Sequence, residues 1–156
     1  METADFEDIS IRRATAADLP ALCGLLEALF TAEAEFQPDA ALQRAGLKAI
    51  LADPNVGRIL VAESEGEPIG MASLLYTVST ALGGRAAFLE DMVVAAPARG
   101  AGVGGALVEA ALEQARADGA LRVTLLTDGD NDGAHRFYRR HGFVRSGMVP
   151  FRRLLD

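Results

Sequence analysis

The stretch that most constrains the fold joins an apolar run to a helix through closely spaced glycines. The apolar run covers residues 89–94, and the turn Arg99–Gly104 (RGAGVG) follows it. Alanines and leucines with helical spacing then continue to Gly119. Glycine allows backbone to approach a ligand closely, and the first turn of a helix leaves N–H groups unpaired. With the positive end of the helix dipole added, this stretch predicts a phosphate-binding turn.

Three alternatives to that interpretation follow from the glycine spacing. A dinucleotide-binding fingerprint needs the spacing GxGxxG in the first strand–helix unit, whereas this GxGxG motif lies mid-chain. A P-loop needs Gly-Lys-Ser/Thr, which the turn lacks. A turn with a purely structural role stays open as long as the motif is considered alone.

Length and charge limit the class of protein. A chain of 156 residues fits one domain with a buried core, and we predict a flexible tail at 1–8 and a single domain at 9–156. The net charge is −7, and residues 1–56 hold ten acids against four bases. This acidic excess favours a cationic partner and argues against nucleic acid.

Hydropathy predicts a protein that does not enter a membrane. The longest apolar run, Leu19–Phe30, is too short to span a bilayer and contains Glu27. The beginning of the chain lacks the pattern of a signal peptide, so we expect a cytoplasmic protein.

Alternation and helical spacing predict one mixed α/β (α+β) domain in the order β α α β β β α β α β β. The predicted strands cover residues 9–12, 58–62, 69–78, 86–94 and 121–126, with one or two more in 143–155, and the predicted helices cover about 15–32, 39–51, 102–117 and 131–141. The apolar run 121–126 is typical of a strand buried on both faces.

Three motifs in order give the chain a resemblance to a known family. The first is 11–19 (IRRATAADL), the second combines Val93-Val94-x-x-Pro97 with the glycine turn, and the third is 131–143 (NDGAHRFYRRHGF). Over residues 9–155 the chain resembles the GNAT superfamily of acyl-coenzyme A-dependent N-acyltransferases. The resemblance implies a mostly antiparallel mixed sheet of six to seven strands with four helices, whose strands splay apart at the cofactor site.

The resemblance also implies acetyl-CoA as cosubstrate, with no metal required. Backbone amides of the glycine turn would hold the pyrophosphate, strand backbone would pair with the pantetheine arm, and the Met92 amide would act as an oxyanion donor. The implied cofactor-binding residues are Met92, Val93, Val94, Arg99, Gly100, Ala101, Gly102, Val103, Gly104, Asn131, Ala134 and Tyr138.

Tyr138 and Glu90 are the predicted catalytic residues. Tyr138 lies seven residues after Asn131, on nearly the same helical face, and would give its phenolic proton to the departing thiolate. An aromatic core position is the alternative for Tyr138, and a helix N-cap is the alternative or additional role of Asn131. Glu90 lies in an otherwise apolar strand, where burial would raise its pKa and make it a base or a water-linked relay.

Acidic residues are the predicted contacts of the acceptor amine. The pair Glu90-Asp91 is similar to a Leu-Glu-Asp stretch of polyamine acetyltransferases, in which these acids hold a cationic amine. A solvent-facing position at a strand edge is the alternative for Asp91. Glu33 and Glu35 follow the first predicted helix, where GNAT proteins build the acceptor site, although a solvated acidic loop is equally consistent with them.

These residues predict acetyl transfer to a primary amine of a small cationic molecule by direct attack in a ternary complex. The lone Cys23 lies in an apolar helical run, which favours a buried structural role over an acyl-carrying nucleophile. A protein N-terminal or lysine acetyltransferase and a non-catalytic acyl-CoA sensor are the alternatives. Homodimerisation is common in the family and is expected on that basis alone.

Overall fold

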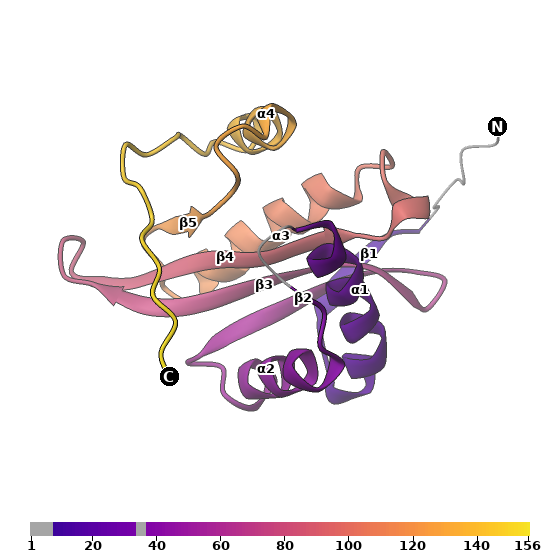
Figure 1. Cartoon of the computed structure of the whole chain (residues 1–156). Coiled ribbons are helices and arrows are strands. Elements are labelled where there is room, and N and C mark those ends of the chain that lie inside the picture. The colour runs from indigo at the N-terminus through magenta and orange to yellow at the C-terminus, as the bar shows by residue number, and fades with distance from the viewer. Residues whose placement is uncertain (1–7, 34–36) are drawn as a thin grey trace. The chain divides into compact units, whose positions relative to one another are not determined.

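A computed structural model of the chain describes residues 8–33 and 37–156. The chain divides into two compact units between Leu126 and Thr127, and each is described by itself. The first unit is built on one five-stranded sheet with the order β1-β2-β3-β4-β5 (Figure 1). Its strands are β1 (Ser10–Arg13), β2 (Gly57–Ser64), β3 (Glu67–Ser79), β4 (Gly84–Val94) and β5 (Val123–Leu125). The pairings are antiparallel up to β4, and β5 pairs with β4 in parallel.

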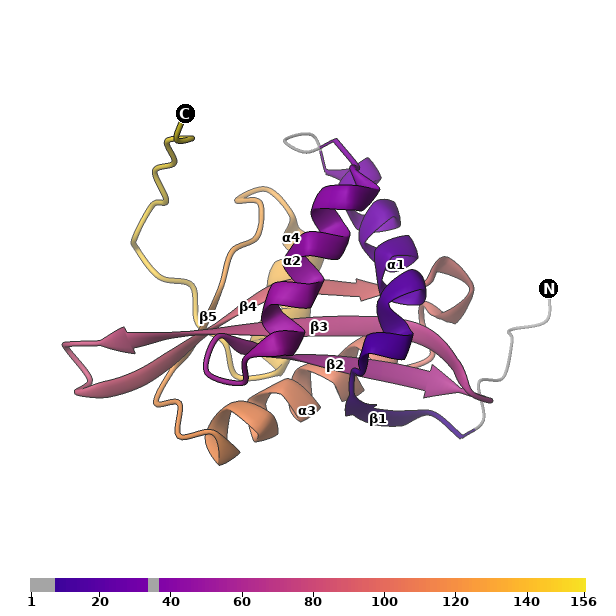
Figure 2. The same cartoon turned by 90° about the horizontal axis from the view of Figure 1, so that it is seen from below.

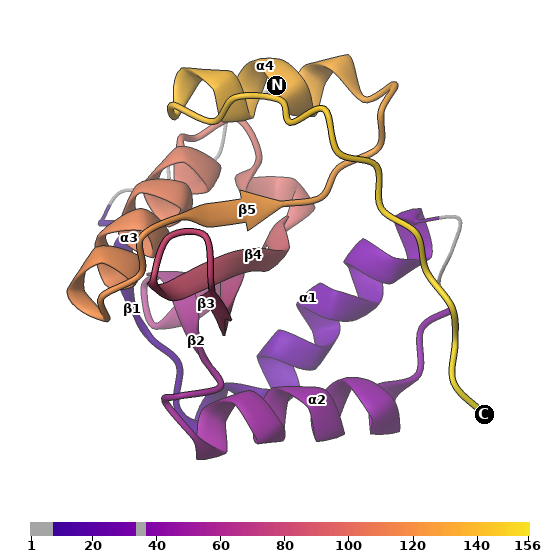
Figure 3. The same cartoon turned by 90° about the vertical axis from the view of Figure 1, so that its left-hand side faces the viewer.

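Three α-helices cover the two faces of this sheet. They are α1 (Leu19–Ala32), α2 (Ala40–Ala52) and α3 (Val103–Ala117). Figure 2 shows α1 and α2 on one face and α3 on the other, and Figure 3 shows the same layers from the side. Leu22 and Leu47 pack with Met71 and Val93 in the core between α1, α2 and the sheet. The burial of these apolar side chains is the main stabilising contribution to the layered unit.

The entry into α1 is held by a capping box. The Asp18 carboxylate accepts the backbone N–H of Thr15 at 2.7 Å, and a one-turn 3-10 helix at Ala16–Asp18 precedes α1. Two nitrogens of Arg12 donate to the same carboxylate, each at 2.8 Å. The helix start that the sequence predicts at Thr15 is therefore confirmed, and the bidentate ion pair ties it to β1.

The second unit contains one helix, α4 (Asp132–Arg140). Asn131 is its N-cap, and Gly142 follows its end with φ +86°, a left-handed conformation that suits glycine. The helix that the sequence predicts at 131–141 is therefore confirmed.

The end of the chain differs from the prediction. Residues 143–155 form no strand, so the described residues contain a five-stranded sheet instead of six to seven strands. Gly147 and Pro150 interrupt the apolar alternation of this segment, and both residues weaken or end strands. Side chains from Val144 to Asp156 are exposed.

The strand predicted at 121–126 is shorter and less buried than expected. β5 covers three residues and is half-buried, and the flanking Leu121 and Leu126 are 58% and 60% exposed. β5 is less buried than predicted because it pairs with β4 alone and lies at the edge of the sheet. An apolar run by itself does not distinguish a central strand from an edge strand.

The predicted tail at residues 1–8 lies outside the described residues except for Asp8. Among residues 8–33 and 37–156, none of the helices is both long enough and apolar enough to cross a membrane.

Candidate functional site

The pairing of β4 changes in its middle, at the acidic pair. On one side, Ala72 pairs with Met92 while Leu74 pairs with Leu89, so that Ser73 alone faces two residues of β4. This two-against-one arrangement is a β-bulge formed by Glu90 and Asp91. On the other side, the pairing with β5 ends at Leu89, and residues 90–94 have no β5 partner. The pairing of β4 with β5 therefore stops in the region where the resemblance implies that the two strands splay apart.

The backbone of β4 beyond the bulge offers hydrogen-bonding groups along that unpaired edge. Ala95 donates its N–H to the carbonyl of Ile69 at 2.8 Å, toward β3. Because alternate residues of a strand direct their backbone groups to the same side, Val93 also faces β3. Met92 and Val94 therefore direct their N–H and C=O groups to the opposite edge, as the predicted pairing with an extended ligand requires.

The glycine-rich turn leads from β4 into α3. Gly100 and Gly102 have φ of +83° and +82°, and a Cβ added at either position would meet no atom within 4 Å. The conformation, and not crowding, is what requires glycine at these positions. Arg99 donates from Nε to the Val94 carbonyl at 3.2 Å, which holds the turn against the end of β4.

The amides of this turn are free to bind an anion. The first backbone hydrogen bond of α3 runs from the Ala106 N–H to the Gly102 carbonyl at 3.1 Å. Within residues 8–33 and 37–126, the N–H groups from Gly100 to Gly105 donate no backbone hydrogen bond, and α3 has no side-chain cap or acidic residue in its first turn. A helix start without a cap leaves its donors and its positive dipole end available to phosphate.

The sequence predicts that Glu90 is buried and that Asp91 lies on the opposite face of β4, but in the structure Asp91 is the more buried of the two. Glu90 is exposed, so the burial predicted to raise its pKa is not found. Asp91 is half-buried, and burial raises the pKa of its carboxyl, with a further increase from the charge of Glu90. A hydrogen bond of 3.2 Å from the Ser73 hydroxyl acts in the opposite direction. The bulge explains this difference, because it interrupts the simple alternation of faces along β4.

The third predicted acid, Glu33, is the C-cap of α1 and is half-buried. Glu35, which the sequence also suggested for the acceptor site, lies outside the described residues.

In the second unit, α4 carries Asn131, Ala134 and Tyr138. The side-chain oxygen of Asn131 accepts the N–H of Ala134 at 3.1 Å, so the N-cap role of Asn131 is confirmed. Such a cap leaves the side-chain amide nitrogen of Asn131 as a donor.

Tyr138 is half-buried among aromatic rings. Its ring lies 5.0 Å from Phe137 and 5.7 Å from Phe143 between centroids, in edge-to-face contacts. Burial raises the pKa of the phenol above its ordinary value of 10.0, so the hydroxyl keeps its proton at neutral pH. This is the protonation state that a general acid requires.

Ser73 is the residue of this site that the sequence analysis missed. It is fully buried in β3, and its hydroxyl contacts Asp91 twice. A single hydroxyl within the apolar run 69–75 was the available signal, although serine is also common in strands for packing reasons alone.

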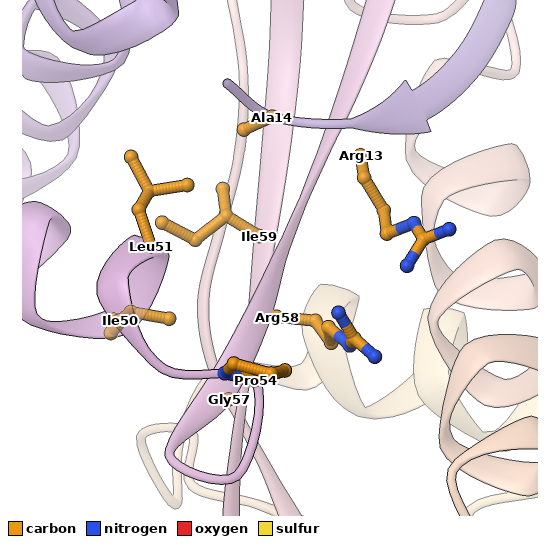
Figure 4. Close-up of a pocket in the computed structure, with 8 residues that line it drawn as sticks. All are labelled: Arg13, Ala14, Ile50, Leu51, Pro54, Gly57, Arg58 and Ile59. Carbon is orange, nitrogen blue, oxygen red and sulfur yellow. The ribbon is translucent and has the colours of Figure 1, made fainter. Parts of the chain in front are cut away.

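A pocket of mixed polar and apolar lining lies elsewhere in the first unit. Its volume is about 110 Å³, and it is lined by residues of β1, β2 and the end of α2, among them Arg13, Ile50 and Ile59 (Figure 4). None of the predicted site residues lines it. Among the described residues, no group of three or more His, Cys, Asp or Glu side chains is placed to hold a metal ion.

Comparisons with known proteins agree with these features. The model of the acetyltransferase (GNAT) family matches residues 19–143. The chain is 34% identical to an aminoalkylphosphonate N-acetyltransferase of Salmonella typhimurium, over 87% of this chain and 85% of that protein. It is 36% identical to an uncharacterised N-acetyltransferase of Bacillus subtilis, over 92% and 95% of the two chains.

A solved structure supports the same assignment. A putative acetyltransferase from Agrobacterium tumefaciens aligns with a TM-score of 0.79 at 33% identity, covering 93% of this chain and 99% of that one. The uncapped glycine turn, the short β4–β5 pairing and these matches have one explanation: the chain belongs to the GNAT family of acetyltransferases and is an N-acetyltransferase.

Proposed function

We propose that this enzyme transfers the acetyl group of acetyl-CoA to the primary amine of a small cationic molecule by direct attack in a ternary complex. The observation that carries the proposal is the row of free donors from Gly100 to Gly105, continued by the unpaired edge of β4. This arrangement suits a ligand with phosphates at one end and an extended amide-containing arm at the other, which is the chemistry of coenzyme A.

The residues of the first unit fit that ligand. Amides of the glycine turn would hold the pyrophosphate, and the outward Met92 carbonyl and Val94 N–H would pair with the pantetheine amides. The thioester supplies the acetyl group. The Met92 N–H is the donor we assign to its carbonyl oxygen, where negative charge develops as the amine attacks.

We assign the two acids of the bulge to the binding and deprotonation of the acceptor amine. A primary amine is protonated at neutral pH and must lose a proton before it attacks. Asp91, half-buried and without a cationic partner among the described residues, would bind the ammonium group. Glu90 is exposed beside it, which suits a relay that passes the proton through water to solvent.

Tyr138 is the proton donor that we propose for the sulfur of the leaving thiolate. The support for this role is the family motif at 131–143 together with a phenol that remains protonated at neutral pH. We assign Asn131 and Ala134 to the cofactor on the same motif.

A small-molecule acceptor is favoured over a protein acceptor by the relative from Salmonella typhimurium, whose name specifies an aminoalkylphosphonate. The acidic excess of residues 1–56 supports a cationic acceptor.

The test combines binding and turnover. Acetyl-CoA binding is measured by calorimetry, and release of free thiol is followed with panels of polyamines, aminoglycosides, aminoalkylphosphonates, amino acids and peptides. We expect turnover with one class of small amine. Turnover with peptides alone would contradict the small-molecule acceptor. Tight acetyl-CoA binding without turnover on any amine would favour an acyl-CoA sensor.

A further inference from the structure

We infer that Ser73 is a positioning residue, which holds the Asp91 carboxylate in the orientation that receives the acceptor amine. The inference rests on the proposed function. It concerns a residue that no sequence motif singles out, and it is carried by the geometry of the bulge between β3 and β4.

The Ser73 hydroxyl makes two hydrogen bonds to Asp91 at the bulge. The Ser73 oxygen accepts the backbone N–H of Asp91 at 3.1 Å, and its hydrogen is donated to Asp91 Oδ2 at 3.2 Å. A serine hydroxyl can do both at once, because it carries one donor and two acceptor positions. Ser73 is 0% exposed, so water does not compete for either bond.

The bulge explains why a side chain is needed there. In a regular antiparallel ladder, the carbonyl of a β3 residue accepts the N–H of its β4 partner. Two β4 residues face Ser73, so the regular ladder is interrupted at Glu90 and Asp91. The Ser73 hydroxyl accepts the Asp91 N–H at this interruption, and the same bond fixes the backbone that carries the carboxylate.

The second carboxylate oxygen is left for a ligand. Within the described residues Oδ1 of Asp91 accepts no hydrogen bond, and it is not among the buried polar atoms that lack a partner. An oxygen with no protein donor that keeps contact with solvent can accept an N–H of an ammonium group. Oδ2 is meanwhile occupied by Ser73, so the carboxylate does not rotate freely.

The charged groups described near Asp91 are acidic, so an incoming cation would meet negative charge at this carboxylate. Glu90, its neighbour on β4, is the charged residue that acts on it. Ser73 and Asp91 lie on the face of Met71 and Val93, against which α1 packs. From α1, leucines face the sheet, Glu27 is exposed and Glu33 caps the C-terminus, so this helix brings no cation.

The experiment is a double-mutant cycle of Ser73→Ala and Asp91→Asn, with kcat/KM for the amine measured across pH. Loss of the Ser73 hydrogen bond is expected to lower kcat/KM by about tenfold while KM for acetyl-CoA stays unchanged. In the Asp91→Asn background the same change is expected to have little further effect, because Ser73 acts through that carboxylate.

The pH profile gives a readout that a merely structural role would not change. The Ser73 hydrogen bond lowers the pKa of Asp91, so its removal raises that pKa and moves the acidic limb of kcat/KM to higher pH. Ser79→Ala is the matched control. Ser79 is also a buried β3 serine, and its oxygen accepts the Leu82 N–H at 3.1 Å, but it has no contact with Asp91.

Carbon-detected titration of the Asp91 carboxyl separates the two proposals. A higher Asp91 pKa in Ser73→Ala than in wild type is expected with any substrate or none. An unchanged Asp91 titration, or additive effects of the two substitutions on kcat/KM, would overturn the inference and leave amine acetylation standing. Wild type that shows no turnover on any amine, with the Asp91 shift still present, would overturn the proposed function instead.

Discussion

The phenol of Tyr76 on β3 donates a hydrogen bond of 2.5 Å to the carboxylate of Asp118, the residue that caps α3. The same carboxylate accepts Arg58 Nε from β2 at 3.1 Å and the Gln114 side-chain amide at 3.1 Å. The guanidinium of Arg85 lies over the Tyr76 ring at 4.7 Å. These contacts attach the end of the helix that follows the glycine-rich turn to three strands of the sheet.

Asp118→Asn should therefore destabilise the first unit. Removal of the charge weakens the pairing with Arg58 and leaves donors in a largely buried place, so we expect the free energy of unfolding to fall by about 1–3 kcal/mol. Urea denaturation measures it. Glu113→Gln, on the exposed face of the same helix, is the control and should change stability by less than about 0.5 kcal/mol. Equal effects of the two substitutions would contradict the role of the network.

Acid should remove stability through Asp18. The hydrogen bond from Arg12 lowers the pKa of Asp18 from 3.8 to about 2 in the folded chain. The folded pKa is depressed, so the stabilisation is complete above the unfolded value and is lost as pH falls from about 4 to about 2. Unfolding free energies of wild type and Asp18→Asn should therefore converge over that range. The control Asp130→Asn, at an exposed loop position, should follow wild type throughout.

Gly102→Ala should weaken acetyl-CoA binding. At φ +82° an L side chain is strained by about 1 kcal/mol, and relief of that strain turns the amides of the first turn of α3. We expect the Kd for acetyl-CoA to rise by about tenfold, which corresponds to about 1.4 kcal/mol. Calorimetry measures it.

Gly46→Ala is the matched control for that substitution. It lies in α2, where φ is ordinary and an added Cβ meets no atom within 4 Å. Alanine there should leave binding unchanged and raise stability by up to about 1 kcal/mol. An unaltered Kd in Gly102→Ala would remove the turn from cofactor binding.

Tyr138→Phe should lower kcat by about a hundredfold and leave acetyl-CoA affinity unchanged, since loss of a general acid affects proton transfer and not binding. Tyr76→Phe provides the opposite pattern, with reduced stability and nearly unchanged kcat, because its hydroxyl belongs to the Asp118 network. Single-turnover kinetics and thermal unfolding measure both quantities. A kcat for Tyr138→Phe equal to that of wild type would exclude the phenol from the reaction.

Glu90→Gln tests which acid of the bulge sets the acidic limb of kcat/KM. The charge of Glu90 raises the pKa of Asp91, so its removal lowers that pKa and moves the acidic limb of kcat/KM to lower pH. This shift is opposite to the one expected for Ser73→Ala. A limb that moves to higher pH, or disappears, would show that the limb reports the ionisation of Glu90, the proposed relay, and not that of Asp91.

The features that the sequence predicted correctly depend on residues that are close to one another in the chain. The capping pair Thr15 and Asp18, the N-cap Asn131 and the glycine turn each depend on contacts within a few positions, and the structure contains all three. Strand order along the chain followed from alternation for the same reason. The segment 143–155 was mispredicted because a strand also needs a partner edge, which no local pattern specifies.

The sequence by itself determined the family, the glycine-rich turn and the acidic pair in β4. Only the tertiary structure decided which acid of that pair is sheltered. The answer depends on where the ladder between β3 and β4 slips, and therefore on Ser73, which lies 18 residues from Asp91. The sequence did not predict the hydrogen bonds around Asp118 for the same reason, since Arg58 lies 60 residues from Asp118 in the chain. Pairing between distant segments is set by packing of the whole sheet, and short-range patterns do not encode it.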